Sequence, residues 1–150
     1  MTNFTDFKTS KMLEELGFDE LELTDNFYNG EGEFNKRKGM PPFEIVADDE
    51  IHAPLWQQVK EWLFENYNIW IVTIRWHGTK NYDFRCWDKD GAFLEDDKVK
   101  TPFNSYIIAE IEGIKKSVEY LYDKKNREDL VEYRKKNSIF HGSGVGIQKL

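Results

Sequence analysis

The sequence has a single cysteine and no long apolar segment, and each shortage excludes a class of structure. Cys86 has no second cysteine to pair with, which excludes an intrachain disulfide and a cysteine-based metal site. No stretch approaches the roughly 18 apolar residues of a membrane span, and residues 1–10 lack the apolar run of a signal peptide. We therefore expect a cytoplasmic protein that does not contact membranes.

Positive charge is also in short supply. The formal net charge is −7, which disfavours phosphate backbones and hence nucleic acid as a partner. Every charged residue from Met12 to Asn35 is acidic, whereas the last third of the chain interleaves lysines and arginines with acids. Such an acidic block can occupy a basic groove on another protein. The residues that we expect to bind a partner in this way are Glu14, Glu15, Glu20 and Glu22.

Motifs with a known catalytic or ligand-binding geometry are missing as well. Acidic clusters at 48–50 and 95–97, and the glycines near the C-terminus, lack the convergent or strand-flanked context that metal and phosphate sites need. A catalytic role for Cys86 would need an exposed, electropositive pocket, and we expect this residue in the core. The sequence therefore predicts no catalytic residue, no metal and no cofactor, and an enzyme is the less favoured alternative.

What is present is a chain of 150 residues, the usual length of one domain, with 15% aromatic residues. We expect one α+β domain over residues 1–140 and a flexible glycine-containing tail over 141–150. Its core is predicted to be an α-β-β-β-α unit, an antiparallel three-stranded meander flanked by helices. An N-terminal helix and a hairpin extend it. The aromatic surplus suggests that some rings lie at an interface.

Apolar spacing places the helices. Thr9 or Ser10 can cap a first helix that ends at Gly17. Pro54 opens a second helix with apolar residues at three-and-four spacing, stopped at 66–68. The last helix follows Asn104 and either continues past Asn126 or restarts there. Its expected buried stripe is Ile107, Ile108, Ile111, Ile114, Val118 and Leu121.

The remaining segments are predicted as strands and turns. The pattern predicts a hairpin at 27–34 with an Asn29-Gly30 turn, and an edge strand at 43–46. Strands follow at 69–76, 82–88 and 92–94, the first two joined by a five-residue loop.

The register of the two long strands predicts which face is buried. If Trp76 faces Tyr82, then Val72 pairs with Cys86 and Ile74 with Phe84. We expect the core face to hold Trp70, Val72, Ile74, Trp76, Tyr82, Phe84 and Cys86. The other face would then gather Thr73, Arg75, Arg85 and Trp87. A ring beside two guanidinium groups is typical of a stacking platform for a planar ligand, and these four residues are the predicted ligand-binding set. A cross-strand Arg75–Asp83 ion pair is the structural alternative.

Three stretches resemble uncharacterised small proteins of Bacteroides-type phages and prophages. They are Thr9 to Phe18, Ala53 to Trp56 running through Trp62-Leu63 to Ile69, and Phe103 to Tyr106. The resemblance covers under half of the chain and implies an origin in a mobile genetic element. It brings no activity or catalytic residues.

We therefore expect a non-enzymatic binding protein, an inhibitor of the anti-defence type that acts on a host protein through an acidic, aromatic-rich surface. The alternative is a protein that binds or sequesters a nucleotide-like ligand on the predicted platform. A homo-oligomer, in which the acidic N-terminal region of one subunit meets the basic last helix of another, is a third hypothesis.

Overall fold

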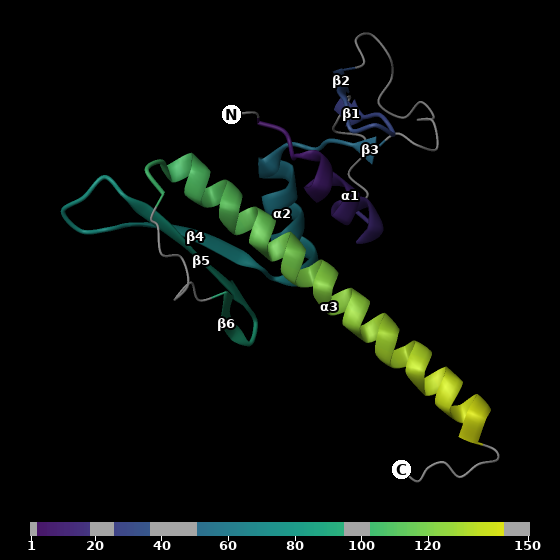
Figure 1. Cartoon of the computed structure of the whole chain (residues 1–150). Helices are drawn as coiled ribbons and strands as arrows, with labels where there is room; N and C mark the ends of the chain where they lie inside the picture. Colours follow the sequence, from purple (N-terminus) through teal and green to yellow (C-terminus); the bar gives the residue numbers. More distant parts are fainter. Residues whose placement is uncertain (1–2, 19–25, 37–50, 95–102, 143–150) are drawn as a thin grey trace.

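The computed structural model describes residues 3–18, 26–36, 51–94 and 103–142. Within them the chain forms three helices and two three-stranded sheets (Figure 1). The elements are α1 (Phe7–Glu15), β1 (Asn26–Tyr28), β2 (Phe34–Lys36), β3 (Ile51–His52), α2 (Trp56–Tyr67), β4 (Trp70–Arg75), β5 (Tyr82–Asp88), β6 (Gly91–Leu94) and α3 (Tyr106–Gly142). The expected mixture of helices with a three-stranded antiparallel sheet is confirmed.

The helix starts differ in how well their caps were predicted. Helix α1 is capped by Asp6, whose carboxylate accepts the Thr9 N–H at 2.8 Å, so the expected cap at Thr9 or Ser10 is wrong. An aspartate three residues before a free N–H competes well for the N-cap position. Helix α2 begins at Trp56 with Leu55 as its N-cap, two residues after the expected start at Pro54. Its buried stripe follows the prediction, with Trp56, Val59, Trp62 and Leu63 buried, and it ends at Asn68 in a left-handed conformation.

Helix α3 is a single helix of 37 residues that continues through Asn126 to Gly142. It therefore extends two residues into the segment expected as a tail, and residues 143–150 lie outside the described part. Ile114, Val118 and Leu121 are buried as expected, but Ile107 is 56% exposed because it lines an open hollow beside α2. Every residue from Asp123 to Lys136 is exposed, and this half of the helix extends away from the sheets (Figure 1).

The main core lies between α3 and the inner face of the β4-β5-β6 sheet. Ile71, Phe84 and Cys86 point from the sheet into this core, where Cys86 is fully buried as expected. The Ser117 hydroxyl donates to the Gly113 carbonyl at 2.8 Å and lies 3.3 Å from the Cys86 sulfur. These contacts hold the middle of α3 close against β5.

The expected register of β4 against β5 is wrong by one residue. The structure pairs Ile71 with Cys86, Thr73 with Phe84 and Arg75 with Tyr82. The connecting loop is shorter than expected, because the Trp76 N–H donates to the Asn81 carbonyl at 2.9 Å and leaves only residues 77–80 between them. The inward residues of β5 are those predicted, but β4 is turned over, so its odd-numbered residues face α3.

The smaller sheet has the order β2-β1-β3 and lies beside α1 (Figure 1). Tyr28 of β1 pairs with Phe34 of β2, and its hydroxyl donates to the Thr5 carbonyl at 2.7 Å. The turn is longer than the expected Asn-Gly turn, since the Asn29 N–H reaches the Glu33 carbonyl. The edge strand expected at 43–46 lies outside the described residues.

Candidate functional site

The four residues of the predicted ligand platform do not share one face of the sheet. Alternation along β4 and β5 puts Thr73 and Arg75 on the side of α3 and puts Arg85 and Trp87 on the outer side. The Arg75 side chain is engaged locally, donating from Nε to the Thr79 carbonyl at 2.8 Å. The structure therefore separates the predicted set into two pairs.

The outer side of the sheet carries an exposed aromatic surface instead. Trp70 is 47% exposed, Val72 40% and Trp76 42%, although the sequence placed all three in the core. Trp70 pairs across the strands with Trp87, and Val72 pairs with Arg85. We call Trp70, Val72, Trp76, Arg85 and Trp87 the outer face.

Helix α2 adds one more ring beside this surface. Phe64 is 46% exposed and lies outside the buried stripe of its helix, with its ring centroid 5.7 Å from that of Trp70. With burial areas of 150–250 Å² for a whole aromatic side chain, the exposed parts of Phe64, Trp70, Val72 and Trp76 amount to roughly 350 Å². A patch of this size on a single chain is often functional.

The charges of the outer face are simple. Arg85 is exposed, and within the described part of the chain no carboxylate forms an ion pair with it. Asp83, two residues away on the same strand, accepts the Phe84 N–H at 2.7 Å. Arg85 therefore lies on the same side of the sheet as Trp70, Trp76 and Trp87, and the carboxylate of Asp83 is on that side as well.

A groove runs between α2 and β4 next to the outer face. Its volume is about 280 Å³, and it is lined by Gln57, Lys60, Glu61, Phe64, Glu65, Ile69, Trp70 and Ile71. The α2 residues recur at helical spacing along one side, and the first residues of β4 form the other. Lys60 is held by an ion pair with Glu110 of α3, whereas Glu61 and Glu65 are exposed and pair with no cation among the described residues.

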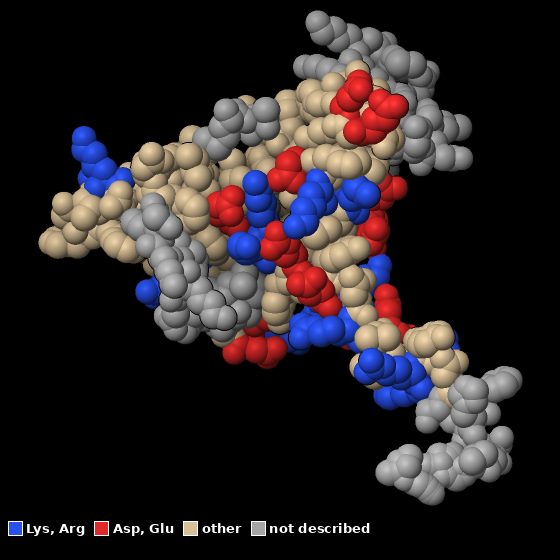
Figure 2. Space-filling view, viewed as in Figure 1, with Lys and Arg blue, Asp and Glu red and all other residues tan. Residues whose placement is uncertain are grey.

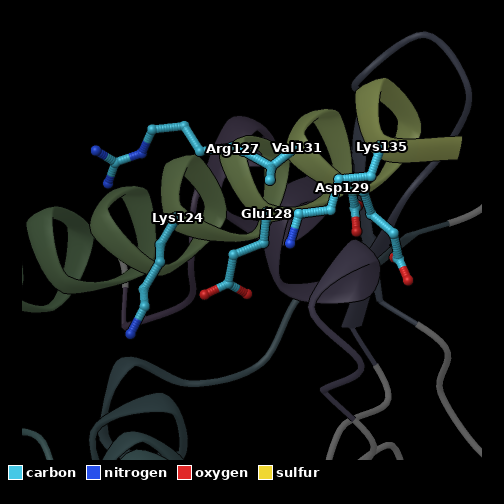
Figure 3. Close-up of a pocket in the computed structure, with 7 residues that line it drawn as sticks. Lys124, Arg127, Glu128, Asp129, Val131 and Lys135 are labelled. Carbon is cyan, nitrogen blue, oxygen red and sulfur yellow. The ribbon is translucent and has the colours of Figure 1, made fainter. Parts of the chain in front are cut away.

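Two other hollows are weaker candidates. One of about 310 Å³ lies between α2 and α3, with Trp56, Ile107 and Ile111 among its walls. The other, about 700 Å³, is lined within the described residues by side chains of α3 alone. Figure 3 shows that these side chains spread to different sides of the helix and do not converge on a common centre. Their three cations and three anions balance, as on a solvated helix.

The acidic residues predicted to bind a partner are only partly described. Glu14 and Glu15 are exposed on α1, and Glu20 and Glu22 lie outside the described residues. Helices α1 and α3 contact each other through charged side chains: Lys125 of α3 donates to the Glu15 backbone carbonyl, and Lys8 of α1 lies 3.9 Å from Glu119 of α3. Red and blue groups accordingly alternate where α1 and α3 meet (Figure 2). Neither contact joins a carboxylate of the acidic block to α3, so the expected pairing between subunits stays a prediction.

Another ion pair, between Asp6 before α1 and Lys115 of α3, has its charged atoms 3.2 Å apart. Burial raises the pKa of Asp6, but the hydrogen bonds from Thr9 and the ammonium group of Lys115 outweigh burial, and that pKa lies below its ordinary value. Lys115 also lies over the Trp56 ring, 5.6 Å from the ring centroid. This cluster joins α1, α2 and α3 and has a structural role.

The described ranges lack two kinds of feature. They contain no group of three or more His, Cys, Asp or Glu side chains placed to hold a metal ion. They also contain no helix whose length and apolarity would suit a bilayer crossing.

Sequence reasoning missed Phe64, Trp70, Val72 and Trp76 as surface residues. Phe64 carried a usable signal, since it lies outside the three-and-four spacing that buries Trp56, Val59 and Leu63. Strand β4 carried a misleading signal, because its more apolar face, with Trp70 and Val72, is the exposed one, and the face towards α3 carries Thr73 and Arg75 beside Ile71.

Comparison with protein-family models, with curated proteins and with solved structures found no match.

Proposed function

We propose that this chain is a non-enzymatic binding protein that docks on a partner protein through the outer face of the β4–β5 sheet. The observation that carries the proposal is the exposure of Trp70, Val72 and Trp76 on one side of a sheet whose other side is covered by α3. The α-β-β-β-α unit is the scaffold for this face, and the N-terminal helix and hairpin extend it.

Apolar area is the main favourable contribution that this surface can make to binding. Removing roughly 350 Å² of apolar surface from water contributes about 9 kcal/mol at 25 cal/mol per Å², which has to offset an association cost of about 4–15 kcal/mol. Tryptophan and arginine are the residues that most often dominate binding energy when an interface buries them centrally. The outer face presents three indoles and Arg85 on one side of the sheet, and aromatic residues with arginine are enriched in interface cores.

A host protein is the proposed partner, in line with the resemblance to phage proteins, and inhibition of that protein is the proposed effect. The acidic residues Glu14 and Glu15 are exposed on α1, which packs against α3. They supply long-range attraction to a basic partner, while the outer face supplies short-range affinity.

The experiment is affinity capture from host-cell lysate with a matched pair of valine-to-arginine variants. Val72→Arg places a charge in the outer face, and Val131→Arg places the same charge on the projecting half of α3, where valine is 50% exposed. We expect Val72→Arg to lose the captured protein and Val131→Arg to retain it, with the interaction then repeated using the purified partner. Equal capture by both variants would refute the proposal.

A second candidate function is binding of a planar, nucleotide-like ligand on the same face. One observation favours it: Trp70 and Trp87 are cross-strand neighbours and Arg85 lies on the same side of β5. Stacking between an indole and a base contributes about 1–3 kcal/mol per base. Titration of tryptophan fluorescence with nucleotides and cyclic nucleotides tests it, and a flat response over the whole panel rejects it.

A further inference from the structure

Strand β4 is an edge strand with a regular set of unpaired backbone groups. In the described residues it pairs only with β5. Trp76 bonds to Asn81, so hydrogen-bonded and non-hydrogen-bonded pairs alternate from there along the ladder. The backbone groups of Trp70, Val72 and Ile74 therefore point to β5. Those of Ile71, Thr73 and Arg75 point to the open edge.

The other side of the sheet supports this assignment. Arg75 pairs with Tyr82, and both backbone groups of Tyr82 are used by Phe103, at 2.7 and 2.8 Å. Tyr82 thus points away from β4, as a member of a non-hydrogen-bonded pair must. Three successive outward positions on β4, each with one N–H and one C=O, therefore have no strand partner among the described residues.

An open edge of this kind is an unusual feature for a stable chain. Many proteins prevent unwanted pairing at an exposed edge strand with prolines, inward-pointing charges or bulges, because the free backbone groups of such a strand can pair with another strand. Strand β4 has no proline, and its paired residues follow a continuous register with β5; its inward charge is Arg75 at the last position, where Nε bonds the Thr79 carbonyl. The earlier part of the edge, at Ile71 and Thr73, therefore lacks these devices among the described residues and can accept a strand.

The groove beside this edge defines the chemistry of such a strand. Side chains of an added strand that point towards α2 would enter the 280 Å³ groove, whose floor is formed by Phe64, Ile69 and Ile71. Glu61 and Glu65 stand on the α2 side without cationic partners among the described residues. A lysine or arginine fits this site, with its stem on the apolar floor and its charge at the carboxylates.

The alternate side chains of the added strand point the other way and extend the outer face. There they would lie beside Trp70 and Val72, which favours apolar residues. We infer that β4 and α2 together bind an extended segment of a partner protein in which basic and apolar residues alternate. The segment adds as a fourth strand to the β4-β5-β6 sheet. This inference rests on the proposed function and specifies the partner's contact segment.

The test is fluorescence anisotropy with three labelled eight-residue peptides on the full chain. The first alternates valine with lysine, the second alternates valine with glutamate, and the third is the valine–lysine peptide with alternate backbone nitrogens methylated. We expect saturable binding of the first peptide and at least about ten-fold weaker binding of the other two, because one lacks the charge and the other cannot pair as a strand. No saturable binding, or equal binding of all three, overturns the inference.

A matched pair of protein variants assigns the binding to the groove. Glu61→Lys with Glu65→Lys reverses two carboxylates at (i, i+4) spacing on α2, and Glu128→Lys with Glu132→Lys makes the same change on α3. We expect at least a ten-fold loss for the α2 pair. The α3 pair should bind as the parent does, and equal loss in both overturns the assignment.

Two further outcomes separate the alternatives. If native mass spectrometry shows a dimer that the peptide cannot displace, the edge binds a second copy of this chain and the inference is overturned. If no peptide binds but capture of a host protein still depends on Val72, the groove inference fails and the proposed function stands. If no peptide binds and capture of the host protein no longer depends on Val72, both the groove inference and the proposed function are rejected.

Discussion

Gly113 of α3 leaves room for the side chain of Ile71. A Cβ atom built on Gly113 would lie 2.6 Å from Ile71 Cγ2 and 3.3 Å from the Phe84 ring. Helix and sheet are therefore in direct backbone-to-side-chain contact at this point. The contact exists only because Ile71, and not Trp70, faces α3.

This contact gives the first prediction. Gly113→Ala should destabilise the protein by about 1–3 kcal/mol, since overpacking outweighs the gain of up to about 1 kcal/mol in helix propensity. Urea unfolding measures the change. In the double variant with Ile71→Ala, the space opened at Ile71 should remove most of the cost of the added methyl group. Strictly additive effects would contradict the close approach.

Strand β4 should tolerate proline at its outward positions and not at its paired ones. The Val72 N–H bonds to β5, so Val72→Pro should cost about 3 kcal/mol or more. The Thr73 N–H points to the open edge, so Thr73→Pro should remain folded. Thermal unfolding followed by circular dichroism compares the two. A folded Val72→Pro beside an unfolded Thr73→Pro would show that the alternation is reversed.

Asp6 should contribute a pH-dependent share of stability. Its pKa is lower in the folded state than in the unfolded chain, so its contribution is present above about pH 4 and is lost as the pH falls through the folded pKa. Asp6→Asn should cost about 1 kcal/mol or less at pH 7, because asparagine still caps helices but cannot pair with Lys115.

Urea unfolding at pH 7 and pH 3 tests this prediction, and the difference between parent and Asp6→Asn should shrink at the lower pH. Glu128→Gln, which removes an exposed carboxylate from the projecting part of α3, is the control and should have little effect. A difference that grows on acidification would contradict the sign of the shift.

The parts of the fold that could be predicted from the sequence are those in which the apolar residues are compatible with only one buried face. Helix α2 has a single apolar face, so the spacing of Trp56, Val59 and Leu63 was enough to predict that these residues are buried. In β5 the alternation is also unambiguous, with Phe84 and Cys86 inward and charged residues between them.

Strand β4 could not be assigned in the same way. The hydrophobic pattern favours the wrong face, since Trp70, Val72 and Ile74 are all apolar, whereas the face that packs on α3 has Thr73 and Arg75 beside Ile71. The length of the loop decides, and Trp76 closes it on Asn81 one residue earlier than the spacing suggested. A single-residue error moved two tryptophans from the surface into the expected core and hid the outer face.

The groove was beyond sequence reasoning for a different reason. Its walls come from α2 and from β4, and only the turn at Asn68 sets the angle between them. The start of α1 was ambiguous because Asp6, Thr9 and Ser10 are all good capping residues within five positions. Tertiary packing of Ser10 against Thr5, with the two hydroxyls 2.6 Å apart, favours the earlier start.

Thiol labelling of two single-cysteine variants is the most direct test of the outer face as a docking surface. Val72→Cys and Ile71→Cys are each made in a Cys86→Ala background and treated with a maleimide, alone and with the purified partner. We predict fast labelling at position 72 that the partner suppresses, and slow labelling at position 71 in both conditions. Fast labelling at 71 with protection at 72 in the free protein, or labelling at 72 that the partner leaves unchanged, would contradict the account.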